Sequence, residues 1–333
     1  MTWQRKGKLC KHIFGHPLKE RVKINNKFAG EILATVTRGG IAESLHLGHL
    51  IVLNADGSTY LSKGSPELPI FPRSAVKSLQ ASAMLKAGLV VSDEELAIVC
   101  ASHSGAQSHI DLVIKMLQKR DIPISALKNA VDKPLGDKEK ITWGEKSASQ
   151  LAQNCSGKHA GMLITCKQNG WEMATYLEID HPLQIAIKNE IEELAGEKVS
   201  TSTFDGCGSP LFAVSLIGLA KSISNLVKSN EAAHKQIVSA CTNYPELVAG
   251  EGRLTTRMMD AVPGLFMKEG AEGIEVCALP DGRVIAIKII DGSWRPVAPI
   301  IMEIFKRWCV VMPDESVKIY GGANVIGEVL VNL

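Results

Sequence analysis

Strand-like segments lie at both ends of this 333-residue chain, and helix-like segments fill the stretch between them. The strand-like segments, rich in β-branched residues, span residues 32–40, 49–63, 273–279, 283–290 and 317–333. Two turn signals, Asp56-Gly57 within one segment and Pro280-Asp281-Gly282 between two others, predict hairpins. We expect strands from both termini to pair in one antiparallel sheet, with helices covering it or forming a second lobe. The predicted fold class is therefore α+β.

Apolar residues recur at helical spacing through the middle of the chain and once near its end. The segments with this spacing are 74–88, 111–120, 182–196, 209–223 and 296–308. Residues 95–105, ELAIVCASHSG, are predicted to form an apolar strand that ends in a turn of small residues. We expect a basic extension over residues 1–30 and one domain over residues 31–333, with a helical lobe at about residues 107–245.

The composition excludes several classes of function. Lys plus Arg number 37 and Asp plus Glu 35, so a net charge of +2 predicts neither a nucleic-acid partner nor an acidic membrane surface. No run of about 18 apolar residues predicts a transmembrane helix, and no apolar run follows the charged start as in a secretory signal. The eight cysteines are scattered through a chain too long to need disulfides. We expect a soluble protein in the reducing cytoplasm.

Three segments carry side chains that could act as nucleophiles or bases. Ser74 and Lys77 would share one face of a helix, and a lysine with a depressed pKa can deprotonate a serine. A solvent-facing serine and lysine on an amphipathic helix would give the same pattern. Ser102 and His103 follow the predicted apolar strand, where they could line a cleft or simply form a turn. Lys268 precedes glycines that would leave room for a substrate, although exposed lysines are common.

Two further segments contain potential metal ligands. NCSGKHAGM includes Cys155 and His159, and DGCGSP includes Asp205 and Cys207. Two thiolates, an imidazole and a carboxylate suit zinc, which favours sulfur and nitrogen ligands. Two small buried cysteines without a metal would give the same residues, and the chain has no CxxC pair to decide between these interpretations.

Six short segments are more specific in their common order than each is alone. They are FPRSAVK, CASHSG, NCSGKHAGM, HPLQ, DGCGSP and KEGAEG. In this order they resemble the L-asparaginase II family of rhizobial, thermolabile type, and RGGIAES and NADG fit as well. The resemblance runs from about Thr35 to Asp291. The chain lacks the TGGTI motif of another asparaginase family, which Thr37-Arg38-Gly39-Gly40 resembles only superficially.

The resemblance implies a fold similar to serine β-lactamases and penicillin-binding proteins, with two Ser–Lys pairs around one cleft. Ser74 matches the nucleophile and Lys77 its base. Ser102 matches the second serine, and its partner is expected to be Lys268, with Lys288 as the alternative.

The resemblance also implies a zinc site and a substrate site. The zinc ligands would be Cys155, Lys158 and Cys207. The positions expected to hold the substrate or to support the metal are Arg73, His159 and Asp205.

The implied activity is hydrolysis of the side-chain amide of L-asparagine to L-aspartate and ammonia, carried out by a homodimer. Ser74 would form an acyl-enzyme, and zinc would organise the substrate pocket. Two alternatives remain at this point. One is a β-lactamase-like or peptidase-like serine hydrolase that acts on another amide, and the other is a zinc-dependent amino-acid sensor without turnover.

Overall fold

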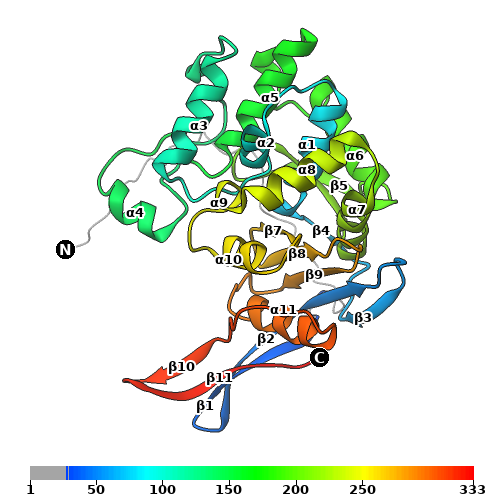
Figure 1. Cartoon of the computed structure of the whole chain (residues 1–333), viewed down its shortest axis with the longest axis vertical. Helices are drawn as coiled ribbons and strands as arrows, with labels where there is room; N and C mark the ends of the chain where they lie inside the picture. The colour runs from blue at the N-terminus through cyan, green and yellow to red at the C-terminus, as the bar shows by residue number, and fades with distance from the viewer. Residues whose placement is uncertain (1–27, 29) are drawn as a thin grey trace, which may run out of the picture.

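The computed structural model describes Phe28 and residues 30–333, so the predicted basic extension lies almost wholly outside the described residues. Within them, one sheet holds eight strands and a smaller sheet holds three (Figure 1). The large sheet comprises β1 (Glu31–Arg38), β2 (Ile41–Leu53), β3 (Thr59–Lys63), β7 (Phe266–Gly270), β8 (Ile274–Ala278), β9 (Val284–Ile289), β10 (Lys318–Gly321) and β11 (Asn324–Val331). Its order is β10-β11-β1-β2-β9-β8-β7, with β3 paired to β2.

The two ends of the chain meet twice in the large sheet. β1 pairs with β11, where Thr35 lies opposite Leu330, and β2 pairs with β9, where Gly48 lies opposite Ile289. Only glycine fits at position 48, because a Cβ atom there would lie 2.5 Å from the carbonyl oxygen of Lys288. The predicted α+β fold, with an antiparallel sheet built from both termini, is confirmed.

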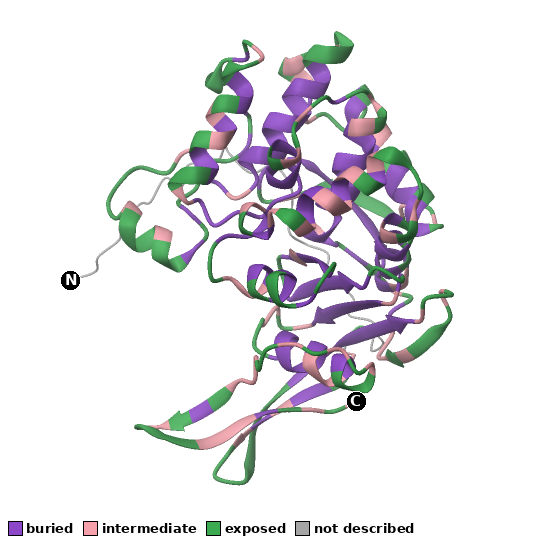
Figure 2. Cartoon of the chain, in the orientation of Figure 1, coloured by how far each residue is buried: buried purple, intermediate pink, exposed green. Residues whose placement is uncertain are grey.

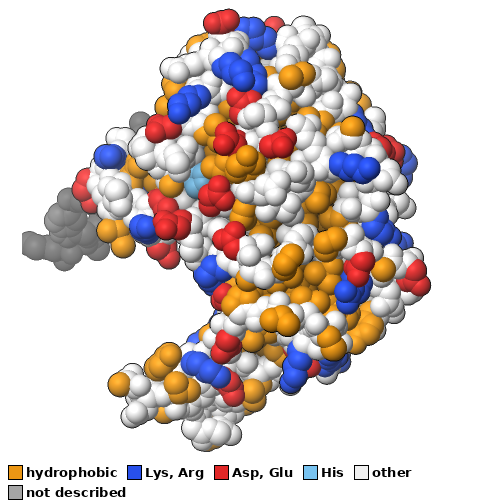
Figure 3. Space-filling model, in the orientation of Figure 1, with side chains coloured by type: hydrophobic (Ala, Val, Ile, Leu, Met, Phe, Trp, Pro, Cys, Tyr) orange, Lys and Arg blue, Asp and Glu red, His pale blue; other side chains and the backbone are white. Residues whose placement is uncertain are grey.

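Burial divides the large sheet into a covered part and an exposed part. Every residue of β8 and β9 is buried, as expected for strands covered on both faces. Helix α7 (Leu216–Lys228) packs against these two strands, and α11 (Val297–Arg307) packs against β11. The outer ends of β1, β2, β10 and β11 form an arm with many exposed residues (Figure 2). The molecule is hollowed between this arm and the helices above it (Figure 3).

The remaining helices form one lobe beside the sheet. They are α1 (Lys77–Lys86), α2 (Asp93–Val99), α3 (Gln107–Gln118), α4 (Asp137–Trp143), α5 (Ser156–Asn169), α6 (Pro182–Ala195), α8 (Ala232–Asn243), α9 (Pro245–Val248) and α10 (Leu254–Ala261). Helix α5 lies at the centre of this lobe, with every residue from 156 to 166 buried. Helices α1 and α2 precede the expected boundary at residue 107, but they belong to the lobe because α1 packs on α6 and α2 on α8.

Two predicted elements differ from the structure. Residues 95–99 belong to helix α2 rather than a strand, because Ser92 and Glu95 form a capping box that starts a helix there. The predicted helix 209–223 divides into strand β6 (Pro210–Ser215) and helix α7. The division falls at Ser215, whose hydroxyl accepts a hydrogen bond from the Gly218 amide at 2.8 Å and so caps the helix.

Strand β6 is the centre of the small sheet, which also contains β4 (Pro69–Ile70) and β5 (Thr201–Phe204). Strand β4 leads directly into the segment that carries Ser74. None of the helices among residues 30–333 is both long and apolar enough to cross a membrane.

Candidate active site

Ser74 lies in a short 3₁₀ turn, Arg73–Val76, that precedes helix α1. Arg73 has a φ of 52°, a left-handed conformation that non-glycine residues seldom adopt. Strand β7 holds the turn in place from the other side. A Cβ atom at Gly270 would lie 2.4 Å from the carbonyl oxygen of Pro72, so only glycine lets the strand approach so closely. The sheet therefore fixes the backbone around Ser74.

Two buried lysines converge on Ser102. The Lys77 ammonium donates to the Ser102 hydroxyl oxygen at 3.2 Å and to the carbonyl oxygen of Ala101 at 2.6 Å. Lys268, on strand β7, donates to the same hydroxyl oxygen at 2.9 Å. All three side chains are almost completely buried. The structure thus brings together predicted residues that are up to 191 positions apart in the sequence.

Ser74 lies close to this group but is not hydrogen-bonded to Lys77. Both residues are among those described, and Lys77 follows Ser74 by about one helical turn. No hydrogen bond joins their side chains. The Lys77 ammonium instead points to Ser102. In the absence of substrate, catalytic hydrogen bonds are often long or unformed, so this arrangement is compatible with a proton transfer that occurs once substrate binds.

The Lys268 ammonium is held in an environment that favours its neutral form. Burial lowers the pKa of Lys268 to about 8, and the nearby Lys77 charge acts in the same direction. The carboxylates of Glu269 and Glu275 oppose this effect only in part. A lysine with such a pKa can exchange a proton near neutral pH, which an ordinary lysine cannot do efficiently.

Cys155, Lys158 and Cys207 form a second buried group beside the lysines. Lys158 on α5 donates to the Cys207 sulfur at 3.3 Å, and Cys207 in turn contacts Cys155. This contact and the charges of Lys77 and Lys158 hold the pKa of Cys155 well below its usual range. Burial disfavours the charge on Lys158, but the neighbouring sulfurs and Asp205 outweigh it and raise its pKa.

The chemistry of this group fits zinc, since two sulfur donors and one nitrogen donor are among the ligands that zinc accepts. Lys158 would have to lose its proton on binding the metal. Among the described residues, no three His, Cys, Asp or Glu side chains gather as a conventional metal site. His159 and Asp205 lie beside the three candidates but do not complete such a site with them.

The residues expected to hold the substrate or support the metal lie in two places: Arg73 and Asp205 are paired, and His159 lies apart from them on α5. The Arg73 guanidinium donates to Asp205 at 2.7 Å, and the cations of Lys158 and Arg73 hold the pKa of Asp205 below its usual value despite its burial. His159 is fully buried and hydrogen-bonded to the Tyr176 hydroxyl at 2.7 Å. Burial lowers the pKa of His159 well below its usual value, so its imidazole is neutral.

Two other sequence candidates are hydrogen-bonded to groups other than the two serines. His103 is hydrogen-bonded to the Ser156 hydroxyl at 2.8 Å and to neither Ser74 nor Ser102. Lys288, the alternative partner of Ser102, donates to the carbonyl oxygens of Glu272 and Ile289 at 2.5 and 2.9 Å.

One residue near the site had no motif to reveal it. Arg253, at the start of α10, donates to Glu269 at 2.5 Å and to the carbonyl oxygen of Ser102 at 3.4 Å. It therefore ties the loop of Ser102 to the strand of Lys268. Arg253 lies in a sequence without recognisable pattern, so only the fold reveals its position.

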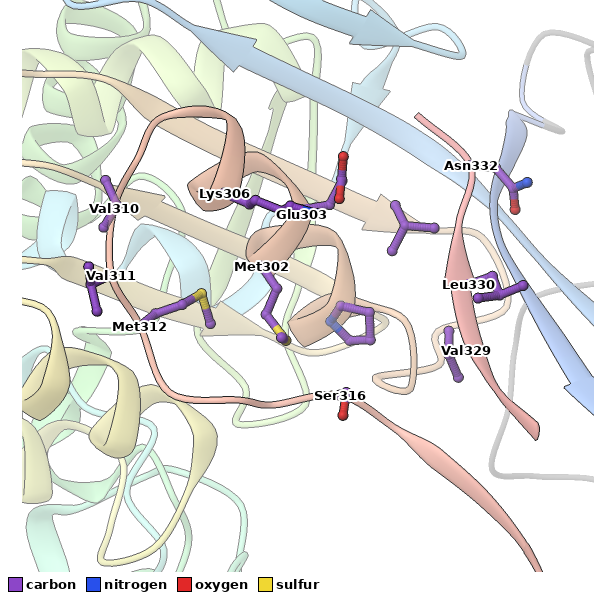
Figure 4. A pocket seen from close by; sticks show the side chains of 12 residues that line it. Met302, Glu303, Lys306, Val310, Val311, Met312, Ser316, Val329, Leu330 and Asn332 are labelled. Carbon is purple, nitrogen blue, oxygen red and sulfur yellow. The ribbon is translucent and has the colours of Figure 1, made fainter. Parts of the chain in front are cut away.

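A cavity of about 780 Å³ lies away from these residues, between α11 and β11 (Figure 4). Its lining includes Met302, Met312, Val329 and Leu330. None of the sequence-predicted site residues lines it, so the reactive groups and this cavity are separate features of the molecule.

A family model described as L-asparaginase II matches residues 34–326. The matched region contains both serines, both lysines that converge on Ser102, and the three candidate zinc ligands. No match was found among the curated proteins.

Proposed function

Because the chain belongs to the L-asparaginase II family, and is therefore an asparagine-hydrolysing amidohydrolase, we propose that it acts through a serine nucleophile, Ser74. The proposed reaction converts L-asparagine and water to L-aspartate and ammonia. The observation that carries this proposal is the convergence of Lys77 and Lys268 on the Ser102 hydroxyl, at 3.2 and 2.9 Å. This arrangement supplies two amines that can accept protons and a hydroxyl that can relay a proton between them. Lys77, one of the two amines, lies one helical turn after Ser74.

In the acylation step, Lys77 acts as the neutral amine and takes the hydroxyl proton of Ser74, and the serine oxygen attacks the side-chain amide carbon. Backbone N–H groups of the turn before α1, including that of Ser74, stabilise the oxyanion. The C–N bond then breaks, and the departing nitrogen receives the proton from Lys77 through the Ser102 hydroxyl. Ammonia leaves, and the aspartyl group remains as an ester on Ser74.

In the deacylation step, a water molecule attacks this ester. Lys268 and Ser102 take the proton of the water, for which the pKa of Lys268 of about 8 is suitable. The ester C–O bond breaks, the proton returns to the Ser74 oxygen, and L-aspartate is released. Each lysine thus ends the cycle in the protonation state in which it began.

The substrate is proposed to bind through charge. The Arg73 guanidinium suits the α-carboxylate of asparagine, and the Asp205 carboxylate suits its α-ammonium group. The hydrogen bond between these two side chains, 2.7 Å long, sets their separation. His159 is proposed to act indirectly, by fixing helix α5 next to Lys158.

Cys155, Lys158 and Cys207 are the proposed zinc ligands. Bound zinc would supply a fixed positive charge that orders the substrate pocket. Since Ser74 supplies the nucleophile, the chemistry needs no metal-bound water. The three ligands come from α5 and from the turn before β6, so the metal would also join these two elements.

The nucleophile is tested by measuring ammonia release from asparagine by the wild-type protein and by Ser74→Ala, with and without a zinc chelator. We expect Ser74→Ala to lose several orders of magnitude in kcat. Ser78→Ala is a matched control, since Ser78 is a buried serine on α1, the helix that follows the Ser74 turn, and its hydroxyl has no hydrogen-bond partner among the described residues. Near-full activity of Ser74→Ala would refute the acyl-enzyme.

A homodimer and a cytoplasmic location are also proposed. The exposed apolar side chains on the arm, including Ile41, Tyr320 and Val325, would be covered if two copies pair there. All seven cysteines among the described residues are free thiols, as is usual in a reducing compartment. The mass of the purified protein in solution, measured by light scattering, tests the dimer.

A further inference from the structure

A cavity of about 550 Å³ lies beside the turn that carries Ser74. Arg73 forms part of its wall, and the other charged residues in the wall are Lys288 and Glu272. Apolar side chains such as Phe71 and Phe204 line the remainder. The wall thus contains two cations, one acid and an apolar rim, next to the proposed nucleophile.

Strand register explains how Lys288 comes to lie near Ser74. Lys288 on β9 is opposite Ile274 on β8, which is opposite Gly270 on β7. Directly opposed residues point to the same face of a sheet, so Lys288 projects on the face where Gly270 contacts the Ser74 turn. Two strand spacings separate Lys288 from Gly270, about 10 Å. Lys288 therefore faces the serine turn across the cavity.

The Lys288 ammonium is fixed but not neutralised by a side chain. Its hydrogen bonds go to two carbonyl oxygens, those of Glu272 and Ile289, and no carboxylate among the described residues forms an ion pair with it. An ammonium group has three N–H donors, so one is left for another acceptor. The side chain is 8% exposed, which limits competition from solvent.

Arg73 has donors left in the same way. Its Nε atom is bonded to Asp205, while neither terminal nitrogen has a hydrogen-bond partner among the described residues. Burial is the largest cause of the lowered pKa of Lys288, the charges of Glu272 and Asp291 oppose it, and the charge of Arg73 acts more weakly in the same direction as burial. Two cations in the wall of one cavity, each with free donors, suit an anion.

We propose that Lys288 is a specificity-determining residue, which binds the α-carboxylate of the substrate together with Arg73. This inference rests on the proposed function and extends it, since it divides recognition between two cations from opposite sides of the cavity. It gives Lys288 a direct contact with substrate and no part in proton transfer. It also makes an α-carboxylate a requirement for efficient hydrolysis.

The test compares wild type, Lys288→Gln and Lys288→Arg with two substrates, asparagine and asparagine methyl ester, by ammonia release. We expect Lys288→Gln to raise KM for asparagine by about 10- to 100-fold, the effect of one hydrogen bond to a charged group, with little change in kcat. Lys288→Arg should restore most of the affinity. For the methyl ester, which has no carboxylate, wild type and Lys288→Gln should have similar kcat/KM.

Lys306→Gln is the matched control, because Lys306 lines the separate cavity of Figure 4. Thermal unfolding of each variant checks the fold, since Lys288 also holds the carbonyl oxygen of Glu272. An unchanged KM for asparagine in Lys288→Gln would overturn this inference. So would an equal loss on both substrates. Absence of asparagine turnover by wild type would overturn the proposed function instead.

Discussion

The pKa of Lys268 leads to a quantitative prediction for the pH dependence of the reaction. With a pKa of about 8, the fraction of Lys268 in its neutral, proton-accepting form is about 9% at pH 7 and about 91% at pH 9. If Lys268 is the base, kcat/KM should rise about tenfold across this range. The sign follows from the direction of the shift, because a lowered lysine pKa moves the active form toward neutral pH.

The variant that isolates this effect is Lys268→Arg. Arginine keeps the positive charge beside Ser102 but cannot lose its proton. We expect it to lose about 10²- to 10⁴-fold in kcat at every pH, the usual contribution of a general base. The assay is initial-rate ammonia release between pH 6 and 10, with Lys306→Arg as the control for an exposed lysine.

Two results would refute this reasoning. One is a rate that does not change between pH 7 and 9 in the wild type. The other is a Lys268→Arg variant with near-normal activity, since that would reduce the role of Lys268 to its charge. A rise with pH that persists in Lys268→Arg would assign the titration to another group.

Two further predictions concern the backbone and the metal. Gly270→Ala should destabilise the fold by about 1–3 kcal/mol and lower kcat, because its Cβ would lie 2.4 Å from the Pro72 carbonyl oxygen and displace the Ser74 turn; an unchanged melting temperature and kcat would contradict this. Cys207→Ser should reduce the zinc content of the purified protein to background, measured by atomic emission against wild type. Retention of zinc by that variant would exclude Cys207 as a ligand.

Turn residues gave a reliable prediction where they separate two apolar strands. The hairpin at Pro280-Asp281-Gly282 forms as expected between β8 and β9, since these turn residues leave few other conformations. Residues 95–99 were predicted wrongly because a short apolar run fits a strand or a buried helix equally well. The cap at Ser92, which lies outside that run, decided between them.

Sequence motifs identified individual site residues, but they did not predict which of these side chains contact one another. Lys268 and Lys288 lie on the same face of the sheet, and only their hydrogen bonds in the folded structure show that Lys268, rather than Lys288, reaches Ser102. His103 follows Ser102 directly, yet its side chain turns to Ser156. Arg253 had no local signal at all. Contacts of this kind depend on segments far apart in the sequence, which local patterns do not encode.

The position of Lys268 has a consequence for synthesis of the protein. The strand that carries it, β7, follows Ser102 by more than 160 residues, and β7 is held in the sheet through β8 and β9 to β2. A ribosome-bound chain that has not yet released β9 would therefore lack both the second lysine of Ser102 and the strand that fixes the turn of Ser74. The enzyme would therefore become active only near the end of translation, once β9 has joined β2.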